Sequence, residues 1–81
     1  MSAVTVQLFA SYAESFGTTA LQIPIKGGAS VSDLIGAIRA LPGSEIVRES
    51  ARVAINRQFA FPDQVVDPSD EIALIPPVAG G

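Results

Sequence analysis

The sequence contains no cysteine and no histidine. Without cysteine the chain has no disulfide, no thiol nucleophile and no thiolate metal ligand. Without histidine it lacks the one side chain whose unperturbed pKa lies near neutrality, which is also the usual general base and the commonest metal ligand. We therefore expect no metal site, no permanently bound cofactor and no catalysis by this chain alone.

Positive charge is also scarce. Four arginines and one lysine stand against eight acidic residues, which gives a net charge of −3. Nucleic-acid-binding proteins need a basic patch, so we expect no nucleic-acid partner. No apolar run approaches the roughly 20 residues that cross a bilayer, and the N-terminal residues lack the basic region of a signal peptide. These features predict a cytoplasmic protein without a membrane partner.

Apolar residues are plentiful, at 48% of the 81 residues. This content is enough to form a core and excludes intrinsic disorder. The length predicts a single domain over residues 1–81, which buries only about 60–65% of its unfolded surface. A carrier, a binding module or a subunit of a larger enzyme is favoured over a self-sufficient enzyme.

Alternation of apolar and polar residues predicts strands over residues 3–9, 19–26, 52–57 and 71–75. Pro24 lies inside the second of these segments and cannot donate to a ladder, so that strand should lie at a sheet edge. The last segment is almost continuously apolar, as in a central strand. Residues 10–17 break the alternation and suit a short helical turn closed by Gly17.

One main helix is predicted to begin at Ser30, whose side chain can form a capping box with Asp33. Its apolar stripe consists of Val31, Leu34, Ile35, Ile38 and Leu41. Pro42 and Gly43 end it. Residues 44–50 are ambiguous and include a possible further helical turn. The order of elements predicts an α+β fold, with one mixed sheet and the helix packed across it.

The connection before the last strand is less regular. Residues 59–66 suit either a short strand or an irregular segment, and residues 67–70 have the composition of a β-turn.

Periodicity assigns eight residues to the core: Val4, Val6, Leu8, Leu34, Ile35, Ile38, Val53 and Ile55. A sheet with one helix has an open face, where an exposed apolar patch would mark a partner site. The candidates for such an interface are Phe9, Phe59, Phe61, Leu74 and Ile75. The four arginines are expected to be solvated, with an acidic partner surface as the alternative for one of them.

Residues 75–81 are predicted to form an extended, flexible tail. Pro76 and Pro77 cannot continue a ladder and favour the polyproline conformation. The residues after them, Val78, Ala79, Gly80 and Gly81, span at most about 14 Å. A chain end this thin can enter a channel that excludes ordinary side chains, and it presents the α-carboxylate of Gly81 without obstruction.

The Gly81 carboxylate is the candidate reactive group. An ATP-dependent partner can convert it to an acyl-adenylate, which a sulfur nucleophile then converts to a thiocarboxylate. After the sulfur has been delivered, the plain carboxylate is restored. This chemistry requires neither cysteine nor histidine on the carrier, which matches the composition of the chain.

Several segments resemble the small subunits of molybdopterin synthase. The resemblance lies in residues 6–10, 30–34, 53–56 and 70–81, and the Pro-Pro-Val-x-Gly-Gly ending is its most specific part. The family usually has an aromatic residue at the position of Leu74. Its members are sulfur carriers with a ubiquitin-like β-grasp fold, which implies that the first and last strands lie adjacent and parallel at the sheet centre.

The resemblance also implies the partners and the chemistry. An E1-like activating enzyme would use ATP to adenylate Gly81, which is then thiocarboxylated. The tail would insert into the large catalytic subunit of a heterotetramer. There, cyclic pyranopterin monophosphate would receive two sulfurs and become the dithiolene of molybdopterin. The chain would thus be the sulfur-donating subunit of a sulfurtransferase complex.

Two other classes of function remain open. A sulfur carrier for thiazole (thiamin) or cysteine synthesis would have the same fold and Gly-Gly ending, although a Pro-Pro pair is less typical of the thiazole type. A ubiquitin-like modifier would form isopeptide bonds with lysines, whereas a plain interaction domain would tolerate the loss of Gly80 and Gly81.

Overall fold

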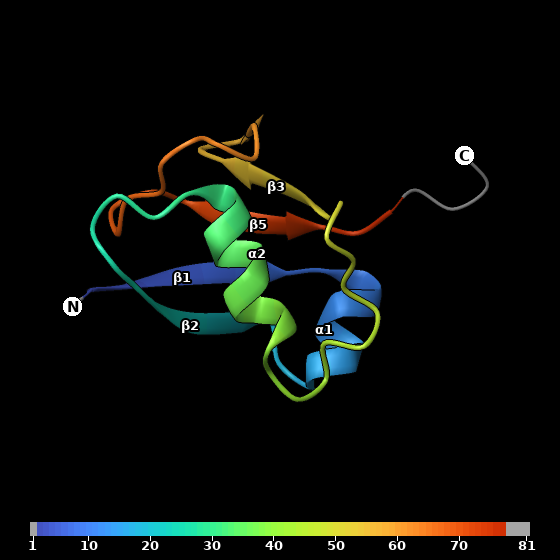
Figure 1. Cartoon of the computed structure of the whole chain (residues 1–81). Helices are drawn as coiled ribbons and strands as arrows, with labels where there is room; N and C mark the ends of the chain where they lie inside the picture. The colour runs from blue at the N-terminus through green and yellow to red at the C-terminus, as the bar shows by residue number, and fades with distance from the viewer. Residues whose placement is uncertain (1, 78–81) are drawn as a thin grey trace.

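The computed structural model of the chain describes residues 2–77, which contain a mixed sheet in the order β2-β1-β5-β3-β4 (Figure 1). The strands are β1 (Ser2–Leu8), β2 (Ala20–Ile25), β3 (Arg52–Ile55), β4 (Gln58–Phe59) and β5 (Ile72–Ile75). β1 and β5 are parallel, and the other neighbours are antiparallel. This confirms the central parallel pair that the family resemblance implies. It also places β2, with its proline, at an edge as predicted.

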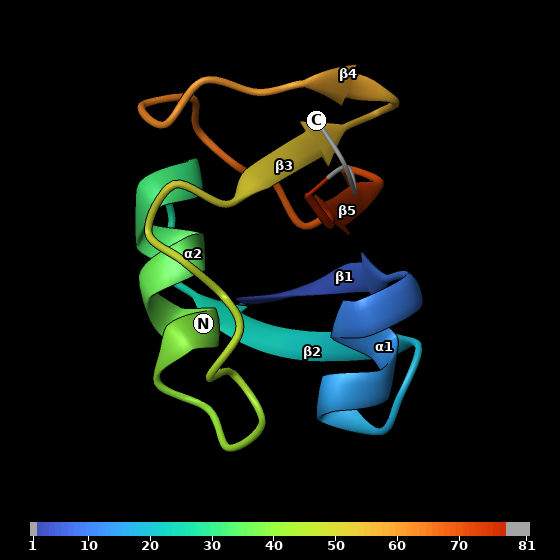
Figure 2. The same cartoon turned by 90° about the vertical axis from the view of Figure 1, so that its right-hand side faces the viewer.

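The main helix, α2 (Val31–Arg39), crosses one face of the sheet (Figures 1 and 2). The predicted capping box is present: the Asp33 amide donates to the Ser30 hydroxyl at 3.1 Å, and the Ser30 amide donates to the Asp33 carboxylate at 2.9 Å. These two bonds satisfy amides that the first helical turn leaves without partners. Ala40 caps the other end.

The short helix α1 (Ala10–Phe16) follows β1 directly and lies at the end of the sheet where β1 and β5 finish (Figure 2). Gly17 ends it in the left-handed conformation, with φ of 71°. The predicted helical turn is therefore confirmed. Neither helix of residues 2–77 is long and apolar enough to cross a membrane.

The core lies between α2 and the sheet. All eight predicted core residues are buried. They are joined by Tyr12, Ile23, Ile25, Val31, Val47, Val66, Ile72 and Leu74. The helix stripe is thus core for four of its five predicted members, and Leu41 is partly buried.

Leu74 corrects one of our interface predictions, because none of its surface is exposed. It pairs with Leu8 on β1 and with Val53 on β3, which are both core residues. Directly paired residues in a sheet share a face, so Leu74 points toward α2. The expectation that it contributes to an exposed partner surface is wrong.

The connections are mostly turns. Residues 44–50 contain turns and no helix, so the possible further helical turn does not form. Residues 59–66 contribute only the end of β4 and an isolated bridge between Val65 and Ser30. The predicted β-turn over residues 67–70 is present, closed by the Asp70 amide on the Asp67 carbonyl at 2.9 Å.

Candidate functional site

The central strand β5 leads directly to the Pro76–Pro77 pair. Its last residue, Ile75, pairs with Arg52 at the start of β3, and the strand ends there. Proline has no N–H to donate, so the ladder cannot continue. The predicted tail residues Val78, Ala79, Gly80 and Gly81 lie outside the described residues. Because β5 lies at the centre of the sheet, the chain leaves the sheet at Pro76 from its middle and not from an edge.

The face of the sheet opposite α2 has small residues at its centre. Gln7, Ala73, Ala54 and Phe59 form one continuous row of paired residues across four strands. The two alanines leave room above the backbone. A hollow of about 480 Å³ results, bordered also by Phe9 and by other side chains of this face.

The predicted interface residues separate into three groups. Phe9, Phe59 and Ile75 border the same hollow on the open face. Phe9 is 47% exposed and Phe59 63% exposed, whereas Ile75 is half-buried. Phe61 is 73% exposed and borders a second hollow of about 390 Å³ beside the start of α2, which Phe59 also borders. Leu74 belongs to the core, as shown above. The first group thus lies around one hollow, and Phe59 connects it to the hollow that Phe61 borders.

One end of the open-face hollow has paired charges. Arg57 contacts Glu71 at 3.4 Å. Asn56 donates to the Asp70 carboxylate at 3.1 Å and accepts from the Glu71 amide at 2.9 Å. Asn56 and Arg57 both have positive φ, at 52° and 71°, as a two-residue hairpin turn between β3 and β4 requires. The charged and polar side chains at this end of the hollow therefore pair with one another.

Beside Pro76 and Pro77 the fold brings together residues that were not among the predicted interface residues, although an acidic partner surface was the alternative for one arginine. Tyr12 and Arg48 lie with Arg52 around a third hollow, of about 400 Å³, which Pro76 and Pro77 also border. Burial raises the pKa of the Tyr12 phenol, and the positive charge of Arg48 partly opposes this rise. No local pattern in the sequence signals this cluster, because α1, the 44–51 segment and β3 are brought together only by the fold.

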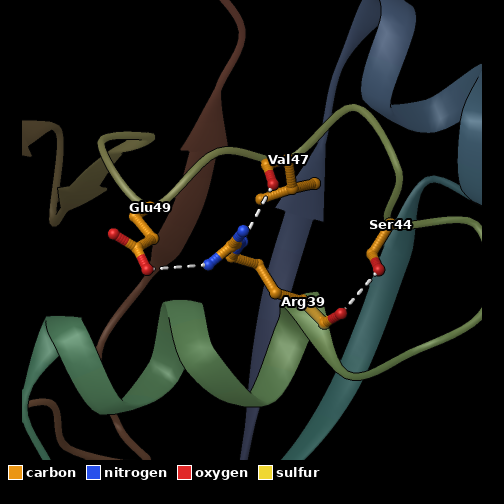
Figure 3. A network of polar contacts seen from close by, with 4 residues as sticks. All are labelled: Arg39, Ser44, Val47 and Glu49. Carbon is orange, nitrogen blue, oxygen red and sulfur yellow. Dashed lines mark hydrogen bonds and ion pairs between the residues drawn. The ribbon is translucent and has the colours of Figure 1, made fainter.

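Arg39 positions the segment that carries Arg48. Its Nε donates to the Val47 carbonyl at 3.1 Å, and its terminal nitrogen contacts the Glu49 carboxylate at 3.3 Å (Figure 3). Ser44 in turn donates to the Arg39 carbonyl at 2.8 Å. One side chain of α2 thus holds the residues on both sides of Arg48.

The described part of the chain, residues 2–77, brings together no group of side chains that could hold a metal ion. It also has no buried side-chain nitrogen or oxygen without a hydrogen-bond partner.

Comparison with known proteins gives consistent results. The model of the ThiS family matches residues 6–81. The molybdopterin synthase sulfur carrier subunit of Arabidopsis thaliana is 29% identical over 79 residues, which is 96% of this chain and 82% of that protein.

Among solved structures, SAMP1 from Haloferax volcanii, a small archaeal modifier protein, has a TM-score of 0.81 at 29% identity and covers 99% of this chain and 100% of its own. In a complex of subunits 1 and 2 of the molybdopterin-converting factor from Helicobacter pylori, the matching chain has a TM-score of 0.67 at 21% identity, over 98% of this chain and 99% of its own. These similarities show a ubiquitin-like β-grasp fold.

Proposed function

This chain belongs to the ThiS family, and from that premise we propose that it is a sulfur carrier whose Gly81 holds the sulfur as a thiocarboxylate. The observation that carries the proposal is the path of β5, which runs through the sheet centre and ends at Pro76–Pro77, ahead of a Gly-Gly ending. The family match extends to residue 81 and so includes this ending. The chain also lacks the cysteine and histidine that most other chemistries would need.

The proposed cycle begins and ends with the Gly81 carboxylate. A carboxylate oxygen attacks the α-phosphorus of ATP, which forms the acyl-adenylate and releases pyrophosphate. Hydrosulfide from a sulfur source attacks the acyl carbon, so that a C–S bond forms, AMP leaves with the carboxyl oxygen, and Gly81 is left as a thiocarboxylate. Transfer of that sulfur to an acceptor and hydrolysis restore the carboxylate. The activating enzyme is of the E1-like type.

The pathway that we favour is molybdopterin synthesis. Support comes from the sequence similarity to the plant molybdopterin synthase sulfur carrier subunit and from the fold shared with a chain of the bacterial two-subunit converting factor. In this proposal the partner is a large catalytic subunit within a heterotetramer. The sulfur acceptor is cyclic pyranopterin monophosphate, which becomes the molybdopterin dithiolene.

The open-face hollow is the proposed contact surface for the large subunit. Phe9, Phe59 and Ile75 surround two alanines there, so that an apolar side chain of the partner can be buried against them. Phe59 and Ile75 border both this hollow and the one beside Pro76 and Pro77. A partner that covers it is therefore placed to receive residues 78–81.

A ubiquitin-like modifier is the second candidate. Its specific support is the similarity to SAMP1, whose identity to this chain equals that of the plant sulfur carrier. In that case a lysine amine of a target protein, in place of sulfur, would attack the activated Gly81 carbonyl and form an isopeptide bond. Carriage of sulfur for thiazole or cysteine synthesis requires the same activated end.

Deletion of Gly81 tests the proposed function. The full chain and the truncated chain are each combined with the activating enzyme, ATP, a sulfur source, the large subunit and cyclic pyranopterin monophosphate. We expect the full chain to support dithiolene formation and the truncated chain, with an unchanged circular dichroism spectrum, to support none. Dithiolene formation by the truncated chain would contradict the proposal, and covalent adducts resistant to thiol reagents would favour the modifier.

A further inference from the structure

The hollow beside Pro76 and Pro77 is positively charged. Two arginines border it, Arg48 and Arg52, together with Tyr12 and Phe59. None of the residues that border it is acidic. In a chain with a net charge of −3, this concentration of cations requires an explanation.

Neither arginine has an acidic partner among residues 2–77. Arg39 and Arg57 each form an ion pair, with Glu49 and Glu71. No carboxylate of the described chain comes within ion-pair distance of Arg48 or of Arg52. Arg39 and Arg57 thus pair with carboxylates, whereas Arg48 and Arg52, which border the hollow beside Pro76 and Pro77, form no ion pair within residues 2–77.

Arg52 is held in place by the sheet. It pairs directly with Ile75 across β3 and β5, so that both residues lie on the open face. Its guanidinium carbon lies 5.3 Å from the centroid of the Phe59 ring, a cation–π arrangement. This contact restrains the side chain without using its hydrogen-bond donors. Within residues 2–77 no side-chain hydrogen bond or ion pair occupies them, so they can bind a planar anion such as a carboxylate.

The backbone at Arg48 is held in place by the residues on either side of it. Val47 is buried, and both Val47 and Glu49 contact the Arg39 side chain (Figure 3). The Glu49 carboxylate, adjacent to Arg48 in sequence, is thereby directed toward α2. Arg48 itself is exposed, and its charge acts on Tyr12 at the same hollow.

The arginine hollow is continuous with the open-face hollow, because Phe59 and Ile75 border both. A partner that buries its apolar side chains on the open face therefore extends over the arginines without a break. Interfaces of this kind have an apolar centre and a charged rim, and complementary rim charges mainly accelerate association and fix the orientation.

We propose that Arg48 and Arg52 bind carboxylate side chains of the large subunit, at the rim of the channel that receives residues 78–81. The two contacts align the tail with the channel before it enters and speed the formation of the complex. This inference rests on the proposed function, because it takes the partner to be the subunit that accepts sulfur from Gly81.

Charge reversal tests the inference. Arg48→Glu and Arg52→Glu are compared with Lys26→Glu, which makes the same change in net charge just after β2, at the opposite edge of the sheet. Binding of each full-length chain to the isolated large molybdopterin synthase subunit of the same organism is measured at low and at high ionic strength. We expect each arginine variant to bind about tenfold more weakly at low ionic strength, mainly through slower association.

The expected difference shrinks at high ionic strength, because salt screens the charges, and Lys26→Glu binds like the unmodified chain throughout. Thermal melting checks that each variant is folded. If a reversal variant unfolds, Arg48→Gln and Arg52→Gln replace it, and they should show the same trend with smaller effects. Arg52→Lys keeps the charge but loses the planar donors, so it should bind more tightly than Arg52→Gln and more weakly than the unmodified chain.

Three results would overturn the inference. If the unmodified chain binds the large subunit and the arginine variants match Lys26→Glu, the inference fails and the proposed function stands. If the arginine variants bind normally but are activated poorly by the E1-like enzyme, the acidic surface belongs to that enzyme. If the unmodified chain does not bind the large subunit, both the inference and the assignment to molybdopterin synthesis fail.

Discussion

Gly43, in the loop after α2, lies against the backbone of α1. Its φ is 89°, and a Cβ added there would lie 2.8 Å from the Ser15 carbonyl oxygen. The Ser15 hydroxyl donates to the Gly43 carbonyl, which holds the two segments together. The position therefore combines a left-handed backbone conformation with a close approach that only glycine allows.

We predict that Gly43→Ala lowers the free energy of unfolding by more than about 1 kcal/mol, because the new methyl group adds a backbone clash to the strain of positive φ. Urea denaturation measures the change. Gly36→Ala is the matched control: Gly36 lies within α2, and its added Cβ would have no atom within 4 Å. It should raise the free energy of unfolding by up to about 1 kcal/mol. Equal effects of both substitutions would refute the tight contact at Gly43.

Tyr12 is the only tyrosine, and the chain has no tryptophan, so absorbance reports its ionisation directly. Burial raises the pKa of Tyr12 in the folded protein, and Arg48 partly lowers it. Because the folded state favours the neutral phenol, Tyr12 contributes to the free energy of unfolding. This contribution is fully present below the pKa that Tyr12 has in the unfolded chain. It is lost as the pH rises from about 10 through the folded pKa.

We predict that the tyrosinate absorbance of the native protein appears at higher pH than that of the urea-denatured chain. In Arg48→Ala the midpoint should move higher still, because the nearby positive charge has been removed. Identical midpoints in the native and denatured protein would contradict the burial of Tyr12. An unchanged midpoint in Arg48→Ala would place Arg48 away from the hollow.

At the scale of the element, β5 carries two different roles on its two faces. Ile72 and Leu74 have no exposed surface and face α2, whereas Ala73 and Ile75 are half-buried on the open face. Stability and recognition are thus assigned to alternate residues of one strand.

We predict that Leu74→Ala lowers the free energy of unfolding by about 2–5 kcal/mol, because it opens a cavity in the core. Ile75→Ala should cost much less stability and should weaken binding to the large subunit by more than Leu74→Ala does when both variants are folded. Urea denaturation and a binding titration on the same two proteins separate these effects. The reverse ranking in stability would show that the register of β5 is wrong.

Leu74 also shows what the sequence can and cannot determine about an element. The run Ile72–Ile75 is apolar at all four positions, so the sequence predicted a central strand but did not assign its faces. The pairing with Leu8 and Val53 assigns them, and that register depends on two other strands. By contrast, β1 and α2 have clear periods, and their buried residues were predicted correctly.

The 44–50 segment was unpredictable for a related reason. It has no period of its own, and its conformation depends on Arg39, which contacts residues eight and ten positions away. Arg48 borders the same hollow as Pro76 only through this tertiary arrangement. The aromatic part of the candidate surface could therefore be predicted from composition and an expected open face. An acidic partner for one arginine could also be suggested, but not which arginines the fold brings together.

At the scale of the whole molecule, the fold has one covered face and one open face. α2 and the core lie on the covered face. The apolar hollow lies on the open face, with the Arg57–Glu71 pair at one end and Arg48 and Arg52 near the other. β5 lies at the centre of both and leads to Pro76. This arrangement gives a partner a rigid surface to bind and a thin chain end to receive, with no catalytic group of the carrier required between them.

The intact mass of the chain, purified from cells with an active molybdenum-cofactor pathway, tests the sulfur-carrier proposal most directly. A Gly81-deleted chain from the same cells is the control. We predict a fraction of the full chain that is heavier by one oxygen-to-sulfur exchange, located in the C-terminal peptide and absent from the control. An unmodified mass that persists after incubation with ATP, the activating enzyme and a sulfur source would contradict the proposal.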